Sequence, residues 1–206
     1  MQERKITNRA QRAQETKEKI YESAKYLFGK YAVDEVTINS IVERAGVAKG
    51  SFYVHFDSKD TLIASLVSDY VKRVDTDYQT YLASLSDDIK ISEVFMLMIG
   101  KIADVISETI GCDAMKALYK VHLSKDANTS AALDYNRDVY KIFNYLLTKG
   151  IEQGEFRSDI SVDTLTRHYI VAFRGICYEW CVRYPNYNLK QQALEHFKIC
   201  IAGIII

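Results

Sequence analysis

Apolar residues along this chain recur mostly three and four positions apart, the spacing that places them on one face of an α-helix. Residues 14–31 combine such an apolar face with a polar opposite face. Helical segments are also predicted at residues 37–45, 49–56, 58–70, 91–110, 115–123, 131–152, 161–183 and 189–204. The pattern therefore predicts an all-α fold of about nine helices with no confident strand.

The residues between these segments are of the types that begin and end helices. Thr37 and Ser161 can accept hydrogen bonds from free N–H groups at a helix start, and Gly46 follows a short helix where a C-cap needs positive φ. Residues 51–56, "SFYVHF", favour a strand by local propensity. We nevertheless predict a helix there, because a glycine bend precedes it and Ser58 can cap the helix that follows.

The composition agrees with a helical, core-forming chain. Its 206 residues are 48% hydrophobic, and its one proline and nine glycines are few for the many turns of an all-β fold. The net charge is zero, but residues 1–30 carry eight basic and four acidic side chains. A basic end on a near-neutral body predicts a local contact with a polyanion, and we expect residues 1–12 to be a flexible basic arm.

Secretion, membrane insertion, metal binding and catalysis find little support in the sequence. The N-terminus has no apolar stretch typical of a signal peptide, and the apolar run at residues 199–206 is too short to span a bilayer. Cys112, Cys177, Cys181 and Cys200 show no C-x-x-C spacing. We therefore expect a cytoplasmic, non-enzymatic protein with reduced core thiols and without cofactor or metal, while a redox role of the cysteines stays open.

Residues 37–56 predict two short helices joined by a glycine bend, which is the helix-turn-helix arrangement. The second helix of this motif enters the DNA major groove. Phe52 and Phe56 share the face that would pack on the preceding helices, whereas Lys49 and Tyr53 share the opposite face. Because Gly50 has no side chain, the start of this helix could approach a phosphate closely.

Residues 16–66, and most specifically "AGVAKGSFYVHFDSKDTL", resemble the tetracycline-repressor (TetR) family of bacterial transcriptional regulators. The rest of the chain is similar to the family in its helical pattern, its length and a "GEF" segment before a late helix. The resemblance implies a DNA-binding domain at residues 1–57 and a ligand-binding and dimerisation domain at residues 58–206. It also implies a homodimeric repressor that a small, largely apolar or aromatic effector releases from an inverted-repeat operator in double-stranded DNA. A regulator without a ligand, acting as an activator or through a protein partner, is the alternative.

Carried over by position, the resemblance implies a set of DNA-contacting residues: Arg9, Arg12, Thr37, Lys49, Gly50, Ser51, Tyr53, His55 and Lys59. Two positions depart from the family pattern. Ala48 stands where a serine is common, and losing an N-cap hydroxyl typically costs about 1 kcal/mol of helix stability. Ala32 stands where a glycine usually follows the first helix, so the turn there could be built differently.

The helices after residue 58 should hold a dimer interface and an effector pocket. A two-fold dimer doubles the base contacts of so short a recognition helix and sets the spacing of the half-sites. We predict an interface on the last two helices, with an intramolecular core as the alternative, at Arg174, Gly175, Tyr178, Cys181, Phe197, Ile201 and Ile204. A mostly apolar pocket with a few polar tips is typical of small-molecule sites. Candidate lining residues, each of which could instead be plain core, are Phe95, Met98, Met115, Tyr119, His122, Tyr140, Phe143, Tyr169 and Phe173.

Overall fold

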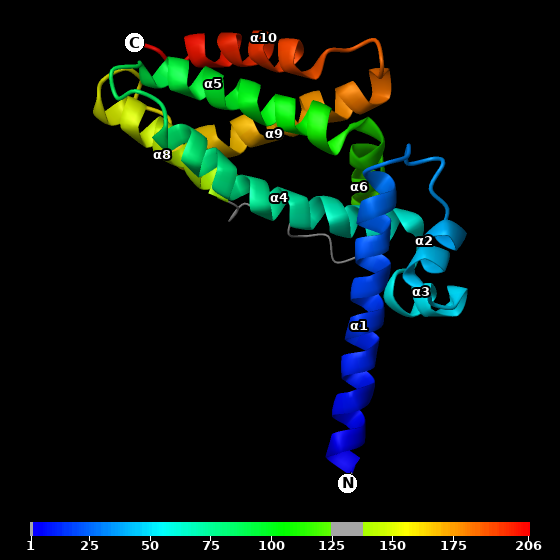
Figure 1. The fold of residues 1–206 in the computed structure, drawn as a ribbon. Coiled ribbons are helices and arrows are strands. Elements are labelled where there is room, and N and C mark those ends of the chain that lie inside the picture. Colours follow the sequence, from blue (N-terminus) through cyan, green and yellow to red (C-terminus); the bar gives the residue numbers. More distant parts are fainter. Residues whose placement is uncertain (1, 125–137) are drawn as a thin grey trace. The chain divides into compact units, whose positions relative to one another are not determined.

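The computed structural model describes the backbone of residues 2–124 and 138–206, and this part of the chain is helical, as predicted (Figure 1). The elements in order are α1 (Gln2–Phe28), α2 (Ile38–Ala45), α3 (Lys49–His55), α4 (Lys59–Ala83), α5 (Ile91–Asp104), the π-helix η1 (Val105–Ile110), α6 (Cys112–Ser124), α8 (Asp138–Glu152), α9 (Val162–Arg183) and α10 (Leu189–Ala202). Among the described helices, none combines the length and the apolar character that a membrane span needs.

The helix expected over residues 91–110 consists of two kinds of helix. α5 ends at Asp104, and the chain continues as η1 until Gly111, whose φ of 83° is open to glycine at little cost. The Gly111 amide donates to the Ile106 carbonyl at 3.0 Å, the wider spacing of a π-helix. Apolar periodicity cannot distinguish these helix types over a single turn. Residues 131–137 of the predicted 131–152 helix lie outside the described residues.

The segment expected to be a flexible arm is part of a helix. The backbone of residues 2–12 continues without a break into the amphipathic part of α1. This stretch contains no glycine or proline, and side-chain hydrogen bonds four residues apart, such as Gln11 to Glu15 and Gln14 to Glu18, support the helix that follows it. The backbone of this segment is helical, and the flexibility of the arm stays a prediction.

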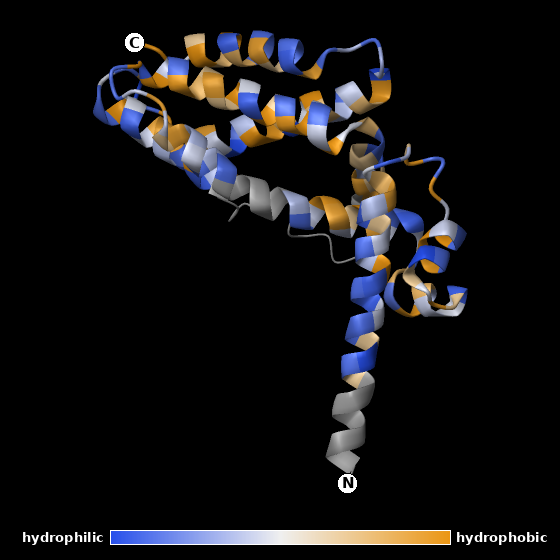
Figure 2. Cartoon of the chain, viewed as in Figure 1, coloured by the Kyte–Doolittle hydropathy of each residue, from blue (hydrophilic) through white to orange (hydrophobic). Residues whose placement is uncertain are grey.

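The chain forms two compact units. The first comprises Met1–Val67 with Ala117–Thr129, and the second comprises Ser68–Lys116 with Ser130–Ile206, as far as these residues are described. Apolar and polar bands alternate along α5, α9 and α10 of the second unit, as expected for helices that bury one face (Figure 2). α10 packs mainly on α5, and α8 packs on both α5 and α9.

The "GEF" segment after α8 joins distant parts of the second unit. The Glu155 carboxylate accepts the backbone N–H groups of Ile91 and Ser92 at 2.9 and 3.1 Å and also the Ser92 hydroxyl, so it caps the start of α5. Phe156 is buried against α8, where a Cβ on Gly150 would lie 2.1 Å from its ring. The segment therefore has a structural role that its sequence does not reveal.

Candidate nucleic-acid interface

Helix α2 begins at a complete capping box. The Thr37 hydroxyl accepts the Ser40 N–H at 3.1 Å, and the Ser40 hydroxyl accepts the Thr37 N–H at 3.1 Å. The helix ends at Gly46, whose φ of 66° lets its N–H donate to the Glu43 and Val42 carbonyls. These two caps leave a bend of only two further residues before α3, which confirms the predicted helix-turn-helix.

Helix α3 is held mainly by packing. Its N-cap, Ala48, makes no side-chain hydrogen bond. Phe52 is fully buried and Phe56 is nearly so, within an apolar core that α1, α2 and the start of α4 complete. The ring centroids of Phe52 and Phe56 lie 5.7 Å apart, and the Lys17 ammonium lies 5.8 Å from the Phe56 ring. Tertiary packing thus keeps a sequence with strand propensity in a helix.

The opposite face of α3 is open to solvent. Lys49 and Gly50 are exposed, and Tyr53 and Val54 keep 51% and 76% of their surface accessible. A Cβ built on Gly50 would meet nothing within 4 Å, so the fold itself does not require a glycine there. This face therefore presents a cation, a phenol, a methyl-bearing side chain and bare backbone.

Val54 belongs to this face but was not among the predicted contacts. It keeps 76% of its surface accessible, and an apolar contact with the methyl group of thymine is one way such a residue reads DNA. The sequence signal that could have identified Val54 as a contact is its position four residues after Gly50, on the same side of the helix.

The other predicted contacts occupy less open positions. Ser51 and His55 are half-buried, and the Thr37 hydroxyl, though exposed, already takes part in the α2 cap. Arg12 is exposed on α1. The side chain of Arg9 lies outside the described residues.

Lys59 is engaged inside the first unit. Its ammonium donates to the Val33 and Val36 carbonyls at 2.8 and 3.0 Å, which ties the start of α4 to the turn between α1 and α2. An ammonium has three N–H donors, so one remains for a phosphate. The side chain was predicted to grip DNA, and its internal hydrogen bonds were not foreseen.

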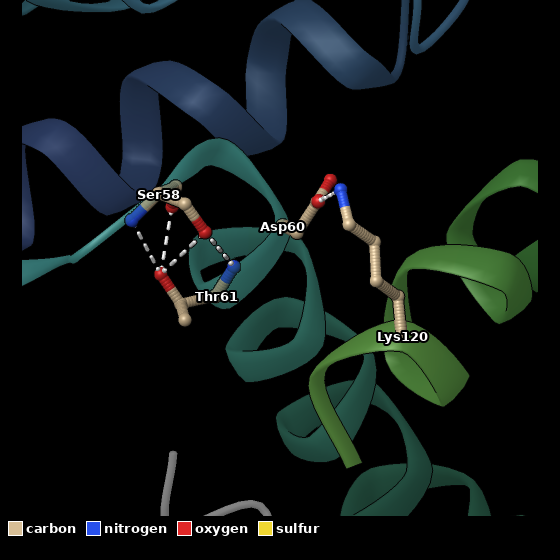
Figure 3. Close-up of polar contacts among 4 residues, drawn as sticks. All are labelled: Ser58, Asp60, Thr61 and Lys120. Atoms are coloured by element: carbon tan, nitrogen blue, oxygen red, sulfur yellow. Dashed lines mark hydrogen bonds and ion pairs between the residues drawn. The ribbon is translucent and has the colours of Figure 1, made fainter. Parts of the chain in front are cut away.

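The first turn of α4 also contacts α6 within the first unit. Ser58 and Thr61 form a reciprocal cap, with N–H to hydroxyl distances of 2.9 and 3.1 Å. Beside it the Asp60 carboxylate forms an ion pair with the Lys120 ammonium of α6 (Figure 3). Because the Lys120 side chain is largely exposed, this pair contributes at most about 1 kcal/mol to stability.

A cationic group formed by the end of α1, the turn after it and α2 was missed by the sequence reasoning. The Arg44 guanidinium carbon lies 3.4 Å from the centroid of the exposed Tyr26 ring, and the Lys30 ammonium lies 4.5 Å from it. A hydrogen bond from Lys30, with the charges of both cations, lowers the pKa of Tyr26. The group fixes two positive charges on the exposed surface of the first unit.

Five of the predicted interface and pocket aromatics meet in the core of the second unit. Phe95 lies 5.1 Å from Phe143, 5.4 Å from Tyr169 and 6.3 Å from Phe197, measured between ring centroids. Phe173 lies 6.0 Å from Phe197. All five are buried, so these rings fill the space among α5, α8, α9 and α10 with one another.

The other predicted pocket residues are dispersed. Met98 and Met115 are buried, and Tyr119 is half-buried. The hydroxyl of Tyr140 accepts a 2.6 Å hydrogen bond from Arg174. The side chain of His122 lies outside the described residues.

The predicted dimer residues divide into buried and exposed groups. Cys181, Phe197, Ile201 and Ile204 are buried within the single chain, which is the intramolecular alternative, and Arg174 is half-buried beside Tyr140. Helical spacing alone could not tell a face that packs on α5 from one that remains open.

Gly175 and Tyr178 belong to an exposed stripe on α9. The stripe continues with Val171 and Val182, which keep 57% and 62% of their surface accessible, at spacings of three and four residues. Ile199 of α10 is 76% accessible. These three apolar residues were missed because helical spacing does not show which face of a helix remains open.

Comparison with known proteins supports the assignment of a helix-turn-helix domain to the first unit. The sequence model described as "Bacterial regulatory proteins, tetR family" matches residues 20–66, the segment from the middle of α1 into α4. The transcriptional repressor KstR2 of Rhodococcus jostii is 24% identical over 180 residues, which cover 86% of this chain and 85% of that protein.

Two solved structures have the same fold over nearly the whole chain. Thermus thermophilus FadR, a TetR-family repressor in complex with lauroyl-CoA, superposes with a TM-score of 0.67 at 18% identity, covering 92% of this chain and 95% of that one. KstR2 of Mycobacterium tuberculosis, a ketosteroid transcriptional regulator, gives 0.56 at 22% identity with the same coverage.

Proposed function

This chain belongs to the tetR family of bacterial regulatory proteins, and on that premise we propose that it is a homodimeric repressor that binds an inverted-repeat operator. The relatives that match it along most of its length are named as transcriptional repressors. A small effector with an apolar body would release the operator. The alternative is a regulator without an effector, acting as an activator or through a protein partner.

The open face of α3 is the observation that carries the proposal. Lys49, Gly50, Tyr53 and Val54 form a surface that is not used by the chain's own packing. In this role Lys49 would neutralise a phosphate and Tyr53 and Val54 would read base edges in the major groove. Gly50 would let the phosphate backbone approach the helix start.

The exposed stripe on α9 is our proposal for the dimer interface, together with Ile199 of α10. An isologous interface uses the same surface on both copies, and exposed apolar residues on adjacent helices suit such contact. Gly175 lies in the middle of the stripe, and a Cβ there would meet none of the described atoms within 4 Å, so a second helix could approach closely.

An apolar effector is supported by two observations. One relative is complexed with lauroyl-CoA and another is named a ketosteroid regulator, so both are associated with molecules that carry an apolar acyl chain or steroid body. In this chain the aromatic cluster of α5, α8 and α9 would supply an apolar wall, and the hydrogen-bonded pair of Tyr140 and Arg174 would supply polar tips beside it.

Selection of sequences from a random duplex pool, followed by binding measurements on the recovered sequence, tests the proposal. We expect an inverted repeat and a logarithmic affinity that falls linearly with the logarithm of salt concentration. Tyr53→Ala should weaken binding to this sequence at least about tenfold, or about 1.4 kcal/mol. The matched control is Tyr31→Ala, which removes an equally exposed ring outside α3 and should leave affinity unchanged. Equal affinity of the Tyr53 variant and the parent would place the reading surface elsewhere.

The effector is tested separately by adding acyl and steroid compounds to the complex with DNA. Release of DNA together with a raised melting temperature of the free protein supports a ligand-responsive repressor. If no compound does either, the regulator without an effector is favoured.

A further inference from the structure

A surface groove separate from the aromatic core runs between α5 and α10. It has a volume of about 690 Å³, within the range of small-molecule sites, and Tyr81 and Ile89 complete one side of it. All of its lining residues belong to the second unit. None of the five rings that fill the core takes part in its walls.

Two contacts fix how its walls face each other. The Lys190 ammonium lies 2.7 Å from the Asp104 carboxylate, and a Cβ on Gly100 would lie 3.8 Å from a Leu194 methyl. Asp104 and Gly100 are one turn apart on α5, and so are Lys190 and Leu194 on α10. The helices are therefore antiparallel, and this register brings Lys198 opposite Leu97.

The floor of the groove is apolar and accessible to solvent. Leu97 and Ile205 keep 41% and 47% of their surface exposed, and Met96, Leu194 and Ala202 line the groove with them. Gly100, which has no side chain, is buried beneath Lys190 and Leu194 of α10, so the two helices approach closely there. Covering this surface with an apolar ligand body would remove it from water, which is favourable.

The charges along the groove are unevenly distributed. The pair of Asp104 and Lys190 closes one end and is neutral in sum. Lys101 on α5 and Lys198 on α10 line opposite walls about one helical turn apart in this register, and Glu93 stands towards the apolar end. The middle is thus cationic, while the carboxylate of Glu93 opposes a second negative charge at the far end.

We propose that this groove binds a monocarboxylate with a linear apolar body. The carboxylate would lie between Lys101 and Lys198, and the apolar body would extend over Leu97 towards Ile205. This arrangement matches a ligand that has one anionic end and one apolar end. The site is additional to the proposed effector pocket in the core and does not depend on DNA binding.

Titration calorimetry of the full chain with decanoate tests the proposal, with 1-decanol as the uncharged ligand of equal chain length. We expect decanoate to bind below about 1 mM and decanol to bind at least about tenfold more weakly. Lys198→Gln removes one cation, and Leu97→Glu places a carboxylate on the floor. Both residues are exposed, so both variants should fold, and each should weaken decanoate binding at least about tenfold.

The control is Lys90→Gln, which removes an exposed cation at the start of α5 outside the groove and should leave binding unchanged. If decanoate binds both groove variants with the same affinity as the parent, it occupies another site, and this overturns the proposal. Absence of binding overturns it as well. If Leu97→Glu instead dissociates a dimer in sedimentation, the groove is an interface between copies.

The failure of this inference is distinguishable from failure of the proposed function. Operator binding is measured on the same variants without decanoate. The groove variants should bind DNA like the parent, because their substitutions lie in the second unit, whereas α3 belongs to the first.

Discussion

Gly50→Ala should raise the stability of the protein while lowering its affinity for DNA. The added Cβ meets nothing within 4 Å, and the residue lies in the first turn of a helix. Alanine is favoured over glycine in a helix by up to about 1 kcal/mol. Because α3 is short and the position is near its start, we expect about 0.5 kcal/mol, or about 1–2 °C in melting temperature.

The effect on DNA binding should have the opposite sign. If the start of α3 approaches a phosphate at this position, a methyl group separates them and weakens the interaction of the free N–H groups with the anion. We expect a loss of at least about tenfold, equivalent to about 1.4 kcal/mol. The loss should be similar for all sequences, because phosphate contacts carry no base information.

Urea denaturation and fluorescence anisotropy with the selected operator measure the two quantities on the same sample. Gly150→Ala is the control for stability: its Cβ would lie 2.1 Å from the Phe156 ring, so the same chemical change should destabilise the protein by about 1–3 kcal/mol. A Gly50 variant that binds DNA as tightly as the parent refutes the close approach. A destabilised Gly50 variant refutes the packing argument instead.

Three further predictions concern stability. Lys59→Met should lower the free energy of unfolding by about 1–3 kcal/mol in urea even without DNA, because two carbonyls lose a charged donor, whereas Lys49→Met should not change it. Glu155→Gln should cost about 1 kcal/mol in the same assay, because a charged cap at the start of α5 becomes neutral. Burial raises the pKa of the Cys177 thiol. Unfolded thiols ionise above about pH 8.5 while the native one stays protonated, so stability falls as pH rises. In denaturation between about pH 8.5 and 10, Cys177→Ala should reduce this fall by up to about 1.4 kcal/mol per pH unit, the limit reached at the upper end of this range; an unchanged slope contradicts the assignment.

The first 67 residues show how far local sequence can lead. The capping residue Thr37, the bend at Gly46 and the apolar positions of the flanking helices each agree with one geometry, and α2 and α3 were predicted to within a residue. Even the strand-like "SFYVHF" could be assigned to a helix, because its neighbours on both sides are unambiguous.

The second unit shows where this reasoning fails. Phe197 and Ile201 were predicted at a dimer interface and lie in the core, while Val171 and Ile199 were not predicted and are exposed. All four have helical spacing. Which face of a helix is covered depends on its neighbours in space, and some of those neighbours come from distant segments, as in the ion pair of Asp104 and Lys190, which are 86 residues apart.

The sequence by itself determined the helical fold, the ends of α2 and α3 and the motif that resembles the tetR family, because caps, glycine bends and apolar periodicity act over a few residues. The tertiary structure decided which side chains remain accessible: the open face of α3, the internal hydrogen bonds of Lys59, the cap by Glu155 and the groove between α5 and α10. Accessibility is a property of packing between distant segments, and no local pattern contains it.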